Sequence, residues 1–460
     1  MQFQYFPYIS PTWYFNLKPK AGDIPYFTDY RKLPEAARSL IDYDAGYSSE
    51  YSSLWDAAYQ AWHKGVIETD ADKTLTEVPK KPGVADNYRF IRKYFHPLWS
   101  WYVLALRLVT LHNPFREISG FRSQRGVRRI DLFKNVYPHE QAFKSFESAL
   151  LQQAPKVSVI IPTLNRYPYL KDALHDLEKQ DYPNFDVIVV DQSEPYQQEF
   201  YEAFDLDIKL IRQEEKALWL ARNTAVKTSD AEYLLLYDDD SRTEPDWISQ
   251  HIKCLDYFDA DISSGVSISM VGAKVPANYA FFRWGDQLDT GNAMVRREVF
   301  RRVGLFDRQF EGQRMGDGEF GLRAYLAGFK NVSNPLAGRL HLKVGSGGLR
   351  QMGSWDAFRP KSLLAPRPVP SVLYLTRKYF GERAARHLLL TSTAPSVIPY
   401  RYKGNKLMML LSIPLSLLLL PFVVVQVWRA YHISSAMVKE GARIEGRLEM
   451  QLNIKKTSNL

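Results

Sequence analysis

Short apolar runs alternate with segments of helical periodicity from Pro155 onward. The runs are rich in valine, isoleucine and leucine, which is typical of strands that are buried on both faces. Apolar residues spaced three and four apart mark the segments between them as helices. The alternation predicts right-handed βαβ units and a mostly parallel sheet. The expected strands are 157–163, 185–193, 208–211 and 233–237, and the expected helices are 169–179, 217–227 and 247–257.

The pattern becomes less regular after residue 260. Two further strands are expected over 261–271 and 290–297, and a helix over 317–327 that ends at Gly328. Because these elements follow the βαβ units without a break in composition, we assign 151–358 to one α/β domain.

Three consecutive acids follow the strand at 233–237. Side chains alternate along a strand, so Asp238 and Asp240 can project to the same side where the strand ends. Ligands of open α/β sheets lie beyond the carboxyl ends of the strands, and two carboxylates there suit a hard divalent cation. A solvated acidic turn, or the start of the helix that begins near Pro245, explains the same acids equally well.

Residues 1–150 form a separate N-terminal region of unknown role that is partly helical. A helix is expected over 48–66, followed by a polar loop at 76–86. The apolar segment 98–111 is too short to cross a bilayer easily and contains Arg107. We expect a buried helix there; the alternative is a helix in the membrane interface, which its tryptophans and the arginines that follow would suit.

The C-terminal region, 359–460, begins with a proline-rich basic connector. Residues 407–427 are uncharged and long enough to cross a bilayer, so we expect a membrane segment at about 407–428. Pro414 and Pro421 are expected to kink it, which membranes tolerate. Whether the segment spans or enters and returns stays open. The polar tail is expected to be helical from Val438 to about Asn453.

Composition and charge narrow the class of protein. The chain has 460 residues and a net charge of +9, which suits anionic lipid, nucleic acid or a phosphorylated ligand. The basic residues are scattered and no groove-reading motif is present, so nucleic acid is not an expected partner. Cys254 is the only cysteine, which excludes an intramolecular disulfide and fits a reducing compartment. The first residues lack a basic start followed by an apolar core, so no signal peptide is expected.

Several motifs, taken in order, resemble a family 2 glycosyltransferase of the bacterial non-processive type. They are VSVIIPTLNR, VIVVDQS, ARN, LLLYDDDS, TGNAMVRREVFRRVGLFD and GDGEFGLR, and they extend from about Lys156 to Ser354. The resemblance implies a GT-A-type, Rossmann-like mixed sheet flanked by helices. A mostly helical N-terminal region would precede it and a membrane-associated helical region would follow it.

The resemblance also implies where a nucleotide-sugar donor binds. The loop after the first strand would contact the base, Asp191 would read a uracil ring, and Arg222 would clamp phosphates. Each has a simpler reading. The loop would be a plain turn with Asn165 as helix cap, Asp191 a turn aspartate, and Arg222 part of a surface ion pair. The residues expected to contact the donor are Pro162, Thr163, Asn165, Arg166, Asp191, Arg222, Asn223, Asp238 and Asp239. Those expected to hold Mn²⁺ or Mg²⁺ are Asp238, Asp240 and His341.

The segment GDGEFGLR would supply the catalytic base. Transfer with inversion needs a carboxylate opposite the leaving diphosphate, and the resemblance assigns this role to Asp317. The family usually has Glu-Asp at this point, whereas this chain has Gly316 before Asp317. Glu319 is close enough to substitute or to bind the acceptor, and Asp317 also suits a helix cap. The glycines at 345–348, with Arg350, would form a mobile loop over the diphosphate.

These features indicate an inverting, metal-dependent transferase of one sugar. The donor would be a nucleotide sugar, UDP-linked, and the acceptor a saccharide or a lipid-linked saccharide in surface polysaccharide synthesis. No GGxGTR loop or QxxRW motif is present, which disfavours a nucleotidyltransferase and a processive synthase. The expected location is the cytoplasmic face of the inner membrane. The alternative is a catalytically silent GT-A-fold membrane scaffold or glycan-binding protein, which Gly316 motivates.

Overall fold

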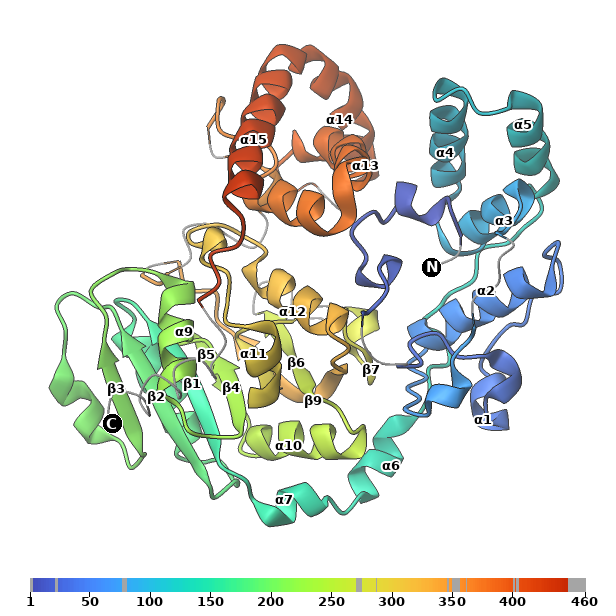
Figure 1. Ribbon diagram of the computed structural model, residues 1–460. Helices are drawn as coiled ribbons and strands as arrows, with labels where there is room; N and C mark the ends of the chain where they lie inside the picture. The colour runs from blue at the N-terminus through green and yellow to red at the C-terminus, as the bar shows by residue number, and fades with distance from the viewer. Residues whose placement is uncertain are drawn as a thin grey trace, which may run out of the picture.

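The computed structural model describes residues 3–20, 24–76, 81–269, 275–286, 288–345, 347–349, 356–360, 362–399, 402 and 405–445. Figure 1 shows a helical N-terminal region beside a twisted sheet, with the C-terminal helices stacked next to both. Two helices, α6 and α7, run from the N-terminal region along the edge of the α/β domain to its first strand.

The N-terminal region is helical, as expected. The expected helices at 48–66 and 98–111 are α2 and α4, and Ser49 caps α2 by accepting a hydrogen bond from the Ser52 amide at 3.2 Å. The expectation that the second helix is buried is wrong, because Leu98, Trp101 and Val109 of α4 are exposed. The helices before the first strand are α1 (Glu35–Arg38), α2 (Glu50–His63), α3 (Val84–Tyr94), α4 (Pro97–Val109), α5 (Pro114–Ser123), α6 (His139–Ser145) and α7 (Ala149–Gln153).

The α/β domain has one mixed sheet of nine strands in the order β3-β2-β1-β4-β8-β6-β9-β5, with β7 paired to β9. The first four are parallel, and β8 runs antiparallel to both β4 and β6. The strands are β1 (Val157–Thr163), β2 (Phe185–Asp191), β3 (Ile208–Arg212), β4 (Tyr233–Tyr237), β5 (Ser241–Thr243), β6 (Ile262–Ser269), β7 (Arg283–Trp284), β8 (Asn292–Arg296) and β9 (Asn331–His341). This arrangement agrees with the expected GT-A-type mixed sheet. The last residues of the strand expected at 261–271 lie outside the described part.

Helices cover both faces of this sheet. Alternate residues of β1 pack with α8 and α10 on one face, and the residues between them pack with α9 and α11 on the other. All seven residues of β1 are buried, which explains why its sequence is almost continuously apolar. The helices of this domain are α8 (Tyr167–Leu177), α9 (Leu218–Thr228), α10 (Trp247–Tyr257), α11 (Arg297–Val303) and α12 (Gly316–Leu326).

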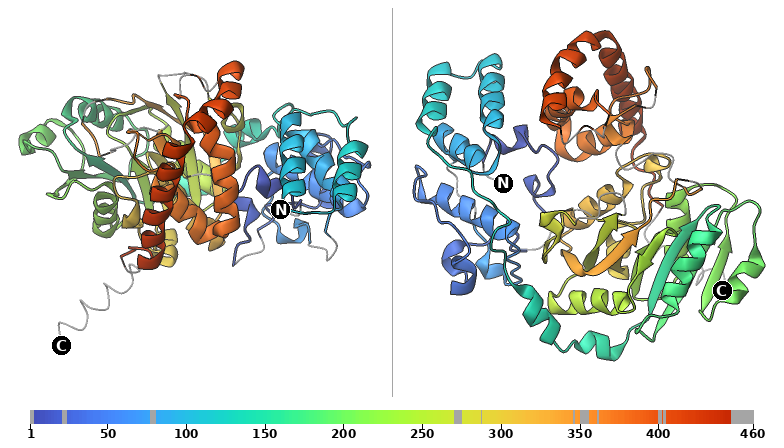
Figure 2. Two further views of the ribbon diagram at one scale, coloured as in Figure 1. Left: turned by 90° about the horizontal axis from the view of Figure 1, so that it is seen from above. Right: turned by 180° about the vertical axis from the view of Figure 1, so that it is seen from behind.

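The C-terminal region contains α13 (Pro370–Ser396), α14 (Lys406–Leu418) and α15 (Leu420–Glu440), and it lies against the α/β domain in both orientations of the molecule (Figures 1 and 2). The apolar run forms two helices bent by 87° at Leu419, so no single helix among the described residues is long and apolar enough to cross a bilayer. The bent pair together meets that test by length and composition alone. Pro421 lies at the start of α15, whereas Pro414 stays inside α14.

The helical tail expected to reach Asn453 is corrected by the structure. Helix α15 ends at Glu440, because Gly441 has a φ of +84°, which favours glycine. Residues 446–460 lie outside the described part.

A buried polar network joins α10 to three neighbouring strands of the sheet. The Asn292 side chain donates to the carbonyls of Val266 and Ala337 and accepts from the Trp247 indole at 2.8 Å. The His251 ring lies 3.1 Å from the same amide oxygen and 2.9 Å from Ser263 Oγ. The network therefore ties α10 to β6, β8 and β9 and fixes the position of the loop that precedes Asn292.

We predict that acid destabilises the fold through His251. Burial lowers the pKa of His251 to about 4, so the unfolded chain binds more protons between about pH 6.5 and pH 4. The contribution of neutral His251 to the free energy of unfolding is fully present above about pH 6.5. Below that pH it falls by up to about 1.4 kcal/mol per pH unit. Denaturant unfolding at a series of pH values should show a shallower pH dependence for His251→Gln than for the wild type. Substituting the exposed His432 should leave the slope unchanged; an unchanged slope in His251→Gln contradicts the prediction.

Candidate active site

Strand pairing brings the three expected metal ligands together. The short β5 pairs antiparallel with β9, so Ser241 lies opposite His341 and the imidazole reaches Asp240, with 3.3 Å between Nε2 and Oδ1. One ligand atom from each of Asp238, Asp240 and His341 lies within 4.8 Å of the others. Burial favours the neutral form of Asp240, but the hydrogen bond from His341 holds its pKa below the usual range. Two carboxylates and an imidazole form a donor set that fits a divalent cation.

Two buried arginines hold Asp238. Arg222 Nη2 lies 2.7 Å from one carboxylate oxygen, and Arg339 Nη1 lies 2.9 Å from the other. Burial opposes the charge of Arg339, but the carboxylates of Asp289 and Asp238 hold its pKa above the ordinary value. The Arg222 side chain is fully buried and donates to Asp238 and to the Thr290 carbonyl; its expected phosphate contact stays a prediction.

Asp239 points away from the metal ligands. Its carboxylate accepts from Thr163 Oγ1 at 2.8 Å and from Arg166 Nη1 at 3.0 Å, and burial raises the pKa of Asp239 to about 6. The side chains of Thr163 and Asp239 are therefore bonded to each other, and their expected donor contacts stay predictions. Arg166 also lies 3.2 Å from Asp240 and donates to the Val344 carbonyl, so it borders the metal site directly.

The loops after β1 and β2 are bonded to each other. Asp191 is at the end of β2, as expected, but it is buried and accepts from the hydroxyls of Tyr167 and Tyr201 at 2.7 and 2.8 Å. Asn165 has a φ of +54° and accepts from the Glu194 amide at 2.8 Å. Both side chains therefore bond to neighbouring parts of the protein, although Asn165 is exposed; their expected contacts with a base stay predictions. The sequence pattern gave no sign of the two tyrosines.

Two further residues expected to contact the donor have structural positions. Pro162 is buried inside β1, where it pairs with Val190, and is not part of the following loop. Asn223 is fully buried, and its amide both donates to and accepts from the backbone of Phe306 at 3.0 and 2.9 Å. Both side chains are buried in this structure, and their expected donor contacts stay predictions.

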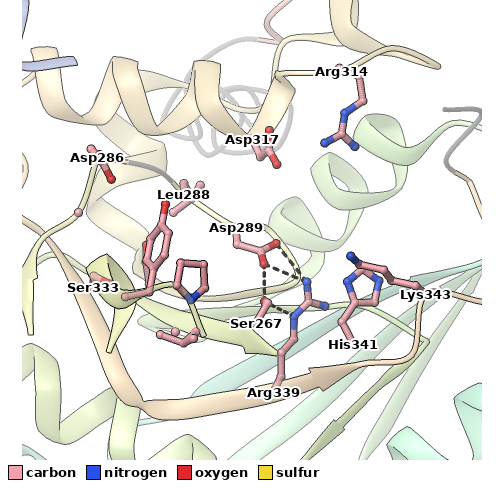
Figure 3. Close-up of a pocket in the computed structure, with 16 residues that line it drawn as sticks. Ser267, Asp286, Leu288, Asp289, Arg314, Asp317, Ser333, Arg339, His341 and Lys343 are labelled. Carbon is pink, nitrogen blue, oxygen red and sulfur yellow. Dashed lines mark hydrogen bonds and ion pairs between the residues drawn. The ribbon is translucent and has the colours of Figure 1, made fainter. Parts of the chain in front are cut away.

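Asp317 and His341 line the same cavity. Its volume is about 300 Å³, and Asp317 enters it from the first turn of α12, on the side opposite the His341 ring (Figure 3). The Asp317 carboxylate accepts from the Gly318 amide at 2.8 Å, so it satisfies one backbone amide in the first turn of its own helix. Other charged residues that line the cavity are Asp286, Asp289, Arg314, Arg339 and Lys343. One of the three candidate metal ligands, His341, and the candidate base therefore border one space.

Glu319 does not reach this cavity. It is fully buried and lies 2.9 Å from Arg323 Nε and 3.3 Å from Lys378 Nζ of α13, and it accepts from the Tyr379 hydroxyl at 2.5 Å. This carboxylate joins α12 to the C-terminal helices, and its expected catalytic role stays a prediction.

The missing acid before Asp317 has a steric cause. A Cβ atom on Gly316 would lie 2.3 Å from Cζ2 of the Trp219 indole, so no side chain fits there unless the indole moves. Trp219 is buried and donates to the Phe310 carbonyl at 3.1 Å, which fixes the ring. The indole therefore fills the position beside the candidate base.

The N-terminal region supports the helix that carries Asp317, which the sequence did not indicate. The Tyr14 hydroxyl donates to the Gly318 carbonyl in the first turn of α12. Near the other end of the helix, the Tyr325 hydroxyl donates to the Leu17 carbonyl at 2.7 Å. The segment that contains Tyr14 and Leu17 thus lies along α12 and holds both of its ends.

The loop after His341 contacts the loop after β1. The Gly348 amide donates to the Leu164 carbonyl at 2.8 Å, and Gly347 has a φ of +66°, which few side chains tolerate. The part of the expected mobile loop that is described therefore lies over Arg166. Residues 346 and 350 of that loop, including Arg350, lie outside the described part.

Gly291 has a packing role that explains the motif TGN. A Cβ atom at this position would lie 2.2 Å from Asp238 Oδ2 and 2.3 Å from Arg339 Nη1. Both atoms belong to the buried ion pair that orients Asp238, so a larger residue would displace that carboxylate.

We predict that Gly291→Ala weakens metal binding by about tenfold or more without unfolding the protein, because support of a ligand by its neighbours commonly contributes this much. Titration of Mn²⁺ by calorimetry, with thermal unfolding of the same samples, measures both quantities. Gly338→Ala is a matched control, since a Cβ atom there meets nothing within 4 Å. Wild-type affinity in Gly291→Ala would show that the Asp238–Arg339 pair does not set the metal site.

Comparisons with known proteins support the resemblance. Residues 158–278 match the model of glycosyl transferase family 2. Glycosyltransferase GlyA of Streptococcus pneumoniae is 29% identical over 165 residues, which cover 35% of this chain and 22% of GlyA. Glycosyltransferase AglE of Haloferax volcanii is 27% identical over 169 residues, which cover 34% of this chain and 53% of AglE. Residues 158–278 of this chain are therefore similar to glycosyl transferase family 2, and the similarity spans about half or less of these relatives.

A third relative has a solved structure. Staphylococcus aureus TarS, a poly(ribitol-phosphate) β-N-acetylglucosaminyltransferase, is 27% identical over 114 residues, which cover 23% of this chain and 20% of TarS. The crystal structure of TarS residues 1–349 with UDP-GlcNAc aligns at 18% identity and a TM-score of 0.40, covering 55% of this chain and 79% of that one.

Proposed function

We propose that this protein is an inverting glycosyltransferase that moves one sugar from a nucleotide donor to a saccharide or lipid-linked saccharide. The observation that carries the proposal is the cavity with Asp317 on one side and His341, next to Asp240, on the other. A general base and a metal-binding group on opposite sides of one space are what in-line displacement of a nucleoside diphosphate requires.

The residues of the cavity suit distinct tasks in such a displacement. The Asp317 carboxylate would take the proton from the acceptor hydroxyl as its oxygen bonds to the anomeric carbon of the sugar. The bond from that carbon to the diphosphate would break at the same time, with inversion. Lys343 and Arg314 line the cavity and bring positive charge toward the departing phosphate oxygens.

Asp240 and His341 would hold the Mn²⁺ or Mg²⁺ ion, with Asp238 nearby. Both oxygens of Asp238 already accept from arginines, so Asp240 and His341 are the stronger candidates for direct contact. A bound cation would supply charge neutralisation at the diphosphate. The ligand atoms lie close enough together for this without rearrangement of the backbone.

The finer identity of the substrates is also a proposal. We take the donor to be UDP-linked from the motif resemblance, although Asp191 is engaged by two tyrosines. TarS is named for transfer to poly(ribitol-phosphate), which favours a role in surface polysaccharide synthesis. The exposed apolar residues of α14 and α15 favour a membrane location, at the cytoplasmic face of the inner membrane.

A catalytically silent scaffold is the alternative function. This alternative was motivated by Gly316, which stands where the family usually has an acid. The Trp219 indole explains the glycine, because it leaves no room for a side chain there, and Asp317 still lines the cavity. Calorimetry with UDP, GDP and their sugar conjugates, with and without Mn²⁺, is the experiment that tests the donor class. Metal-dependent binding without donor hydrolysis or transfer would favour the scaffold, and a preference for GDP would overturn the UDP assignment.

We predict that Asp240→Asn abolishes metal-dependent donor binding, with a loss in Mn²⁺ affinity of more than about 100-fold, because a direct ligand is removed. Calorimetry of Mn²⁺ and of UDP in the presence of Mn²⁺ measures the loss. Asp207→Asn, on an exposed residue of the same domain, is the control and should bind as the wild type does. Unchanged affinity in Asp240→Asn would remove this residue from the metal site.

We predict that Asp317→Asn keeps donor binding within about twofold and lowers kcat by about 10²–10⁴, the range expected when a general base is lost. Release of UDP during transfer measures turnover, and calorimetry on the same preparation measures binding. Transfer at the wild-type rate would show that another group takes the proton.

A further inference from the structure

Exposed apolar side chains gather at two turning points of the chain. The first, the α4–α5 corner, contains Val109, Leu111 and Phe115, whose exposed fractions are 79%, 93% and 83%. The second, the α14–α15 bend, contains Leu417 and Leu418, exposed by 64% and 78%. Exposed leucines occur singly on many proteins, but clusters of this size mark a surface that contacts something.

Both turning points project from the same end of the molecule. The corner and the bend lie at the same end in Figure 1 and in the view from behind in Figure 2, to either side of the N-terminal arm. A flat apolar partner that meets one of them is therefore in a position to meet the other.

Tyr8 connects α4, which leads to the corner, with α13. The Tyr8 hydroxyl accepts from Arg383 Nη2 of α13 at 2.8 Å and from Arg107 Nη1 of α4 at 3.3 Å. The Tyr8 ring packs edge-on against His387 of α13, with 4.6 Å between ring centroids. Helix α13 in turn donates from Arg377 to Ser434 of α15 at 2.9 Å. The corner and the bend are thus connected through packed, hydrogen-bonded elements.

The charges around both turning points suit anionic lipid. No Asp or Glu occurs between residues 97 and 116, or between 383 and 439. Exposed cations flank the apolar tips: Arg116 follows Phe115 directly, and Lys406 and Arg429 lie toward the bases of α14 and α15. A bilayer accepts apolar tips with basic residues at headgroup level, and this pattern favours lipid over a protein partner.

The depth of the bend fits one leaflet. From Leu420 to Trp428, which is 64% exposed and precedes Arg429, α15 rises by about 12 Å at about 1.5 Å per residue. The hydrocarbon core is about 30 Å thick, so the tip reaches less than half of it before a tryptophan and a cation return to the interface. The 87° angle also precludes a straight span by the pair.

We propose that the α4–α5 corner and the α14–α15 bend insert together into one leaflet of an anionic bilayer, the corner shallowly and the bend more deeply. The two contacts would fix the orientation of the α/β domain at the lipid surface, which one contact does not. This inference is independent of the proposed catalytic function, because it needs neither donor nor metal.

The test uses the full-length protein and vesicles of phosphatidylcholine with and without phosphatidylglycerol. Leu111→Glu with Phe115→Glu removes the corner, and Leu417→Glu with Leu418→Glu removes the bend. Each pair should weaken co-flotation with anionic vesicles by about tenfold or more, because apolar burial drives such insertion. Tyr43→Glu with Phe133→Glu is the matched control, since both aromatic residues are exposed outside the two tips, and it should float as the wild type does.

A second measurement separates insertion from folding defects. Leu111→Cys and Leu418→Cys, labelled with an environment-sensitive dye, should both show increased and blue-shifted emission when anionic vesicles are added. Cys254 is buried and offers little background labelling. A response at residue 418 alone, or flotation unaffected by the corner substitutions, overturns the proposal. Oligomerisation that the corner substitutions abolish while flotation persists would identify a contact between copies instead, and also overturns it.

Discussion

Buried guanidinium groups hold the acidic run after β4 together. Three consecutive carboxylates within a protein interior repel one another and lose hydration, so each needs a cation or strong donors. Asp238 has Arg222 and Arg339, Asp239 has Arg166 and Thr163, and Asp240 has His341. Removal of one partner from such a pair commonly costs about 3–5 kcal/mol, because the remaining charge stays buried. The geometry of the site therefore depends on the arginines that pair with its carboxylates.

Local sequence patterns predicted the parallel part of the sheet and the position of the acids. Apolar runs of strand length are clear when both faces of a sheet are covered, as they are for β1 and β4. Strand β9 was not predicted, because Pro335 and Gly338 interrupt it and most of its residues are only partly buried. Yet β9 carries both Arg339 and His341, and its pairing with β5 sets the distance from His341 to Asp240. The histidine was expected from the motif resemblance rather than from a strand pattern.

The donor side of the site was less predictable than the metal side. Short polar side chains at strand ends bond equally well to a ligand or to the neighbouring loop, and sequence alone does not distinguish these uses. Asn165 and Asn223 both bond to backbone that lies elsewhere in the chain, and Asp191 is closed off by two tyrosines. By contrast, the place of Asp317 was predictable. A carboxylate in the first turn of this helix lies near the end of the sheet both if it caps the helix and if it acts as a base. Its support from Tyr14 links residues 304 positions apart, beyond the reach of any periodic pattern.

Helix α12 is held by segments from both the N-terminal and the C-terminal regions of the chain. The functional unit of this protein is therefore larger than the α/β domain. The family match stops at residue 278, before Asp317 and His341, so an excised piece of that length would lack half of the site. Extension to residue 358 would restore those side chains. The helix would still lack its contacts with Tyr14 of the N-terminal region and with Lys378 of α13. Substitutions far from the motifs, in the two regions that contact α12, are accordingly a route by which new substrate specificity can evolve in this chain.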